Sequence, residues 1–280
     1  MNITTALQKA EQEYKSRLED YLSKIFSEVY LPSHGTEHHR RVWHYAKELA
    51  AVAAESLKPD DSYTSVRLII ACYLHDAGMA YDTGESHGAI SRKLCEEFIA
   101  DHNLPPALYD GLPEAIEAHD DKDYLSDNND SFLRIILNSA DDLDALGFIG
   151  IYRYLEIYIA RGIPFRELGV KILRNVTTRF DKFSERFGSF PGIYKQHTAR
   201  YRIIKNFCEN YIRESEDYLF DSGNPEGYCG IAEITGELTR KRIPVNEAAR
   251  WCDENSCYDA VILWFFNELR KELLPDSIQE

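Results

Sequence analysis

The sequence has no long hydrophobic run. A membrane-spanning helix needs about 18 consecutive apolar residues, and the longest apolar burst here, AVILWFF at 260–266, is far shorter. The N-terminal stretch MNITTALQKAEQEYKSRLEDYL also lacks the apolar segment that follows a basic start in a secretory signal peptide. We therefore expect no membrane span and predict a cytoplasmic protein.

Closely paired cysteines are missing as well. The six cysteines are scattered without a CxxC pair, and Cys252 and Cys257 have no histidine nearby. A thiolate zinc site is therefore not expected, and reduced cytosolic thiols are favoured over disulfides. The chain also shows no Ser–His or Cys–His pattern of the kind used in nucleophilic catalysis.

Positive charge is in short supply, because the formal net charge is −15 at pH 7. An acidic surface repels nucleic-acid backbones and anionic membranes, so general binding to either is not expected. A small phosphorylated substrate remains compatible with this charge, since a metal cluster can dominate the local field inside a pocket.

Strand-like alternation of apolar and polar residues is absent, whereas helical periodicity runs through nearly the whole chain. The predicted fold class is therefore all-α, and 280 residues with 44% hydrophobic content can bury a sizeable core. Helical segments are predicted at 4–30, 37–57, 62–78, 85–103, within 105–120, 130–147, 148–162, 166–187 and 192–217.

A Gly/Pro-rich break, DSGNPEGYCG at 221–230, interrupts the helical pattern. It predicts a main domain at 1–220 and a small C-terminal extension at 221–280 with two or three helices. The role of the extension stays open at this point. Its aromatic segment WCDENSCYDAVILWFFNELRKEL could pack on a second protomer, so a homo-oligomer formed through the C-terminal helices is one prediction.

Several histidines and aspartates fall at helix ends or on apolar helix faces. Helix bundles commonly build metal sites from such inward-facing side chains, and this N/O donor set suits Mn, Fe, Co, Ni or Zn. A His–Asp pair on one backbone can serve two ions, with the Asp bridging them, so two divalent ions are predicted. The candidate ligands are His38, His75, Asp76, His87, His119 and Asp141.

A plain structural interpretation competes with the metal site. A single histidine near an apolar face is more often a satisfied core or surface residue than a ligand, and we apply that interpretation to His34, His39, His44, His102 and His197. The His–Asp dipeptide at 75–76 is also common by chance. From the spacing alone, both interpretations remain open.

Three local motifs resemble the HD superfamily of metal-dependent phosphohydrolases. HHRRV resembles the segment that carries that family's first ligand, LHDAG resembles its central His–Asp motif, and NSADDLDALGFIGIYRY is similar to its last motif. The resemblance spans about residues 24–213. It implies an HD-type helical bundle and selects His38 over His39, and Asp141 over its acidic neighbours, as ligands. Binuclear relatives add two histidines, which match His87 and His119.

The resemblance implies a phosphohydrolase in which Asp76 bridges the ions and a water on the metal ions attacks phosphorus. Arg153 and Arg41 are candidate phosphate clamps, since guanidinium geometry matches phosphate oxygens. His34, in the LPSHGTEH loop, is a candidate general acid. A structural ion pair for the arginines and an exposed loop position for His34 are the alternatives.

Two other functions stay open. Some HD-type relatives use a di-iron site with mixed His and carboxylate ligands to activate oxygen, which makes an oxygenase the first alternative. A helical sensor or binding module with a non-catalytic site is the second alternative. The presence of every ligand type argues against a degenerate site.

Overall fold

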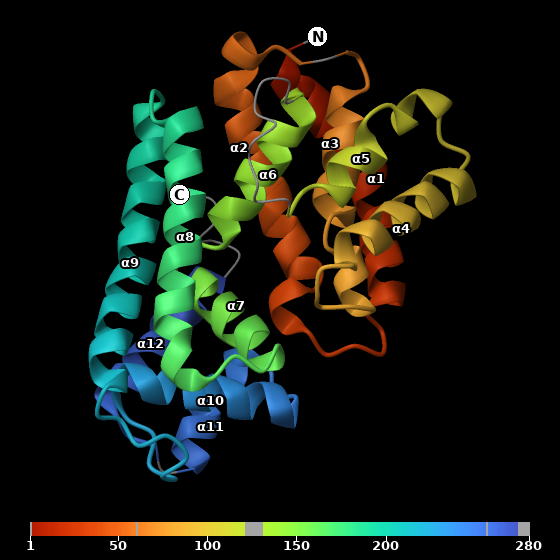
Figure 1. The fold of residues 1–280 in the computed structure, drawn as a ribbon. Helices are drawn as coiled ribbons and strands as arrows, with labels where there is room; N and C mark the ends of the chain where they lie inside the picture. The colour runs from red at the N-terminus through yellow and green to blue at the C-terminus, as the bar shows by residue number, and fades with distance from the viewer. Residues whose placement is uncertain (1, 60, 121–130, 256, 274–280) are drawn as a thin grey trace. The chain divides into compact units, whose positions relative to one another are not determined.

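In a computed structural model the chain is helical, and no strand is present in the residues described, which are 2–59, 61–120, 131–255 and 257–273. The predicted all-α class is confirmed. The helices (Figure 1) are α1 (Ile3–Ile25), α2 (Thr36–Leu57), α3 (Thr64–Leu74), α4 (His87–Asp101), α5 (Leu112–Glu117), α6 (Phe132–Asp144), α7 (Gly147–Ala160), α8 (Phe165–Phe187), α9 (Pro191–Ser215), α10 (Gly227–Lys241), α11 (Ala248–Glu254) and α12 (Ala260–Leu273).

Short 3₁₀ turns separate several of these helices. The turns used below are η1 (Pro32–His34), between α1 and α2, and η2 (Ala77–Ala80), between α3 and α4. The chain forms two compact units, Met1–Leu143 and Asp144–Glu280. The division into 1–220 and 221–280 that the sequence suggests stays a prediction. Residues 1, 60, 121–130, 256 and 274–280 fall within those predicted ranges and lie outside the described residues.

The first unit is built around α3. Every residue from Leu68 to Leu74 is completely buried, because α3 packs against α1, α2, α4 and α5. This explains why its sequence is apolar nearly all round rather than on one stripe. The apolar faces of α1 and α2 cover it, with Leu18, Leu22 and Leu49 fully buried. The polar residues that end α3 are therefore carried into the interior.

The second unit is dominated by the long antiparallel pair α8 and α9 (Figure 1). The aromatic repeat of α8 is buried between them, and Phe180 stacks on Tyr201 of α9 with ring centroids 4.1 Å apart. Helix α10 packs on α7, α9 and α12. In α12, Phe265 and Phe266 are buried while Trp264 is 45% exposed, so most of this aromatic segment serves the unit's own core.

The turn into α7 depends on the C-terminal part of the chain. Gly147 has φ +74°, which favours glycine, and a Cβ there would collide with the Glu272 carboxylate. That carboxylate accepts the Ile149 N–H at 3.0 Å and pairs with Arg200 at 3.2 Å. Glu272 of α12 thus supplies the N-terminal cap that the residues before α7 do not.

All six cysteines are free and buried. Among the helices of the described ranges, none is long and apolar enough to cross a membrane.

Candidate metal centre

The end of α3 places the His–Asp pair inside the first unit. The helix keeps its last hydrogen bond from the His75 N–H to the Ala71 carbonyl at 2.9 Å, and Asp76 then leaves the helical conformation. His75 is fully buried and Asp76 is 5% exposed. A buried imidazole and carboxylate need polar partners, and both find them on neighbouring helices.

Four ligand atoms from three segments meet in a first group. The Nε2 atoms of His38 and His75 are 3.2 Å apart, and Asp76 Oδ2 lies 3.3 Å from His38 and 3.6 Å from His75. Asp141 Oδ1, from α6, completes the group at 3.8 Å from His38 and 3.7 Å from His75. Ligands about 2.1 Å from one ion lie roughly 3.0–3.4 Å apart at tetrahedral or octahedral angles. These distances between ligand atoms, 3.2–3.8 Å, are therefore close to those that one ion requires.

A second group shares the same aspartate. Asp76 Oδ1 lies 3.0 Å from His119 Nε2 and 3.6 Å from His87 Nε2. The two oxygens of one carboxylate therefore face two different pairs of imidazole nitrogens. All these residues are buried, and the two groups together have the donor chemistry of a site for one or two divalent ions.

The far nitrogens of the same rings contact backbone carbonyls. His75 Nδ1 lies 3.1 Å from the Cys72 carbonyl oxygen, and the Nδ1 atoms of His87 and His119 lie 2.5 Å and 2.6 Å from the carbonyls of Gly84 and Ile116. A carbonyl can only accept, so each Nδ1 carries the hydrogen and Nε2 is the atom available to an ion. Ligating histidines are usually fixed in this manner.

Burial and the neighbouring charges shift the pKa values of several residues in the cluster. Burial by itself raises the pKa of Asp76, but the nearby His75 and the hydrogen bonds from His119 and His38 outweigh it, so the pKa lies well below its usual value. Burial lowers the pKa of His119, whereas the contact with Asp76 raises it more, to about 9. The pKa of His75 is lowered, with burial the main cause. Asp76 therefore stays ionised amid imidazoles.

Two glycines let the second group assemble. A Cβ on Gly78 would lie 2.1 Å from the carbonyl oxygen of His87, and a Cβ on Gly88 would lie 2.5 Å from that of Glu117. The Gly78 N–H also donates to the Ser91 hydroxyl at 2.8 Å. Because neither glycine has a side chain, η2 can touch the start of α4, and α4 can touch the end of α5.

Comparison with known protein families agrees with this geometry. A scan against such families matches HD-CE over residues 13–218. The chain belongs to the HD-CE family. The match includes all the candidate ligands in both groups and ends just before the Gly/Pro-rich break. Searches of curated proteins and of solved structures gave no match.

The predicted catalytic residues of the HD-CE chain take three different positions. Asp76 is at the centre of the cluster, as described. His34, in η1, is buried rather than exposed; its ring centroid is 5.4 Å from that of His38, and its Nδ1 is 2.7 Å from the Ser33 hydroxyl. Arg153, in the second unit, donates from Nη1 to the buried Asp144 carboxylate at 2.9 Å. The roles of His34 in proton transfer and of Arg153 in phosphate binding stay predictions.

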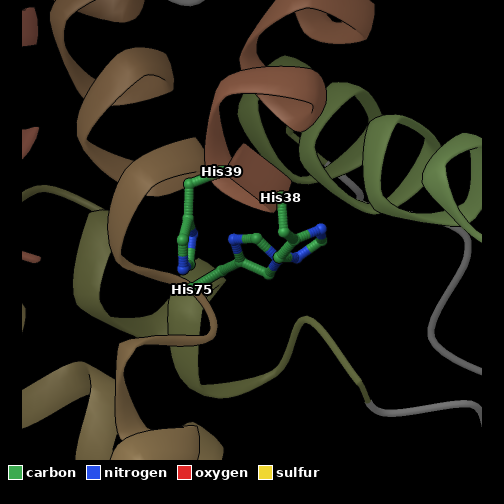
Figure 2. Close-up of side chains that lie close together, drawn as sticks. All are labelled: His38, His39 and His75. Carbon is green, nitrogen blue, oxygen red and sulfur yellow. The ribbon is translucent and has the colours of Figure 1, made fainter. Parts of the chain in front are cut away.

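One histidine that the sequence analysis treated as an ordinary core or surface residue, His39, lies beside two of the candidate ligands, His38 and His75. His39 is fully buried, and the centroids of His38, His39 and His75 are 5.0, 5.1 and 5.3 Å apart (Figure 2). These three rings form a further group with ligand-like spacing. The only sequence signal was the adjacency of His39 to His38, which by itself does not show that both rings turn inward.

Proposed function

We propose that this HD-CE protein is a metal-dependent phosphohydrolase that cleaves a small phosphoester, with a nucleotide as one possible substrate. The observation that carries the proposal is the arrangement of Asp76, whose Oδ2 faces His38 and His75 while its Oδ1 faces His87 and His119. A carboxylate placed in this way could serve both ions of a pair about 3.5–4 Å apart, the spacing found in two-metal sites.

The ligands divide naturally between two ions. His38, His75 and Asp141 would hold one ion with Asp76 Oδ2, and His87 and His119 would hold the other with Asp76 Oδ1. Divalent ions bound there would supply a water of lowered pKa and would stabilise charge on the phosphoryl oxygens. No side-chain nucleophile is needed, which agrees with the lack of a Ser–His or Cys–His pattern in the sequence.

The chain's own residues would contribute orientation and proton transfer. The backbone carbonyls of Cys72, Gly84 and Ile116 fix the rings so that each Nε2 faces Asp76. His34 is close enough to His38 to be a general acid that protonates the leaving oxygen, and Ser33 would orient its ring. For Arg153 we retain the proposal of a phosphate clamp.

The test is a hydrolysis assay on protein of defined metal content. Purified protein is stripped with a chelator, reloaded with Mn²⁺, and assayed for phosphate release from an aryl phosphate and from a panel of nucleotides. We expect release that depends on the metal and disappears in Asp76→Asn. His102→Ala is the matched control, because His102, just after α4, has its ring nitrogen 2.9 Å from the Phe98 carbonyl oxygen and its ring against that of Phe98, and it belongs to neither ligand group.

The same preparations separate the alternatives. Bound metal without phosphate release, together with oxygen uptake on a polyol or phosphonate by iron-loaded protein, would contradict the hydrolase and support an oxygenase. Failure to bind any divalent ion would contradict both enzymes and favour a binding module. The proposed homo-oligomer is examined independently, by light scattering of the wild type and of Trp264→Ala.

A further inference from the structure

His39 shares an acceptor with a proposed metal ligand. Its Nδ1 lies 3.2 Å from the Cys72 carbonyl oxygen, and His75 Nδ1 lies 3.1 Å from the same oxygen. Cys72 is in the last turn of α3, where carbonyls lack the partner that a continuing helix would provide. The two lone pairs of this carbonyl thus receive one N–H from α2 and one from the ligand itself.

The rest of the His39 ring makes no other hydrogen bond within the described part of the chain. Nε2 is buried and has no hydrogen-bond partner there. An apolar side chain would fill the same space without an unpaired nitrogen, which costs about 1–3 kcal/mol when buried. The contact with the Cys72 carbonyl is therefore the polar interaction that this ring supplies.

We propose that His39 is a positioning residue for the first ion, which fixes the Cys72 carbonyl so that His75 keeps its hydrogen on Nδ1 and directs Nε2 toward His38 and Asp76. The Cys72 carbonyl accepts the Nδ1–H of His75 and so fixes the orientation of that ring. His39 links the same carbonyl to α2, the helix that carries His38. The second group is anchored on other carbonyls, those of Gly84 and Ile116, and does not depend on His39. This inference rests on the metal centre of the proposed function but not on the reaction.

The experiment measures Mn²⁺ affinity rather than activity. Free Mn²⁺ is followed by electron paramagnetic resonance during titration of a His119→Ala parent, in which the first group is the complete one. Two variants are made in that parent: His39→Leu removes the N–H donor, and His39→Asn keeps a donor near the position of Nδ1. His102→Leu is the matched control, because His102 also contacts a carbonyl through Nδ1, at 2.9 Å, but lies in neither group.

We expect His39→Leu to weaken Mn²⁺ binding roughly 10- to 100-fold, the range typical for loss of an outer partner of a ligating histidine. We expect His39→Asn to restore most of the affinity and His102→Leu to have no effect. The melting temperature of metal-free His39→Leu should equal or exceed that of its parent, which a purely structural role would not allow.

Three results would overturn the proposal. The first is an unchanged affinity in His39→Leu. The second is an equal loss in the Leu and Asn variants, which would make His39 itself a ligand. The third is a lower melting temperature that accounts for the loss. Should His39→Leu not fold, His39→Asn decides alone, because parental affinity supports the donor role and weak binding contradicts it. Mn²⁺ binding without phosphate release would contradict hydrolysis only and would leave this inference standing.

Discussion

Asp76 and His119 are 43 positions apart in the sequence, yet Asp76 Oδ1 lies 3.0 Å from His119 Nε2 inside the first unit. The other oxygen of the same carboxylate lies 3.3 Å from His38 Nε2. This single side chain therefore joins two imidazole groups that have no other residue in common. The stoichiometry of bound metal should depend on which of these residues is removed.

His119→Ala should reduce bound metal from about two ions per chain to about one, because it breaks the second group and leaves the first intact. The measurement is inductively coupled plasma mass spectrometry of protein reloaded with Mn²⁺ and freed of excess metal. Asp141→Ala should give the same count by breaking the other group. A wild-type count of one that neither variant changes would contradict the binuclear arrangement.

Asp76→Asn should abolish tight binding of both ions and the phosphate release that depends on them. The amide has nearly the same size as the carboxylate but lacks the charge that the four imidazoles face, and a neutral oxygen is a poor bridge between cations. Isothermal titration with Mn²⁺ is the measurement, and circular dichroism checks that the helices remain. Retention of one tight ion in this variant would show that Asp76 does not bridge.

Much of this site could be predicted from the sequence because its ligands lie where apolar helix faces end. Periodicity identifies the inward face of α2 and α6, and it places His38 and Asp141 on those faces. His75 and Asp76 follow a segment so apolar that it must be buried. His87 and His119 were candidates because they lie at helix ends, and the resemblance to the HD superfamily matched them to the added histidines of binuclear relatives. Their contacts with Asp76 depend on the packing of α3, α4 and α5, which no local pattern encodes.

What the sequence missed depends on tertiary packing. His38 and His39 are neighbours on a helix, so only one was expected to face the core, yet both are buried because the rings of His75 and Phe26 lie within 6.2 Å of that of His39. The first helix was predicted to reach residue 30 but ends at Ile25. There the Ser27 hydroxyl donates to the Lys24 carbonyl at 2.9 Å, a local bond that competes with further helix.

Gly78→Ala should destabilise the first unit and disturb the second ligand group. The added Cβ would lie 2.1 Å from the His87 carbonyl oxygen and 2.9 Å from the Ser91 nitrogen, and both are backbone atoms that cannot rotate away. We expect the free energy of unfolding to fall by about 1–3 kcal/mol, as measured by urea denaturation with a chelator present, and one metal ion to be lost.

Gly192→Ala is the matched control for that substitution. Gly192 lies in the first turn of α9, and a Cβ there meets nothing within 4 Å. Alanine is a better helix former, so this variant should keep its metal and gain about 0.5–1 kcal/mol. If both glycine variants behave alike, backbone entropy and not close approach would explain the effect of Gly78→Ala.

Asp144→Asn should cost about 3 kcal/mol of unfolding free energy in the second unit, because it removes the negative charge that faces the Arg153 guanidinium in a buried site. The Asp144 side chain is completely buried and that of Arg153 is 9% exposed, so solvent screening is weak. Glu247→Gln, which removes the exposed pair with Arg250, should cost less than about 1 kcal/mol. Urea denaturation at two salt concentrations gives both values. The stability lost in Asp144→Asn should not depend on salt concentration. An interaction energy near zero between Asp144 and Arg153 in a double-mutant cycle would show that their ion pair does not cause the loss.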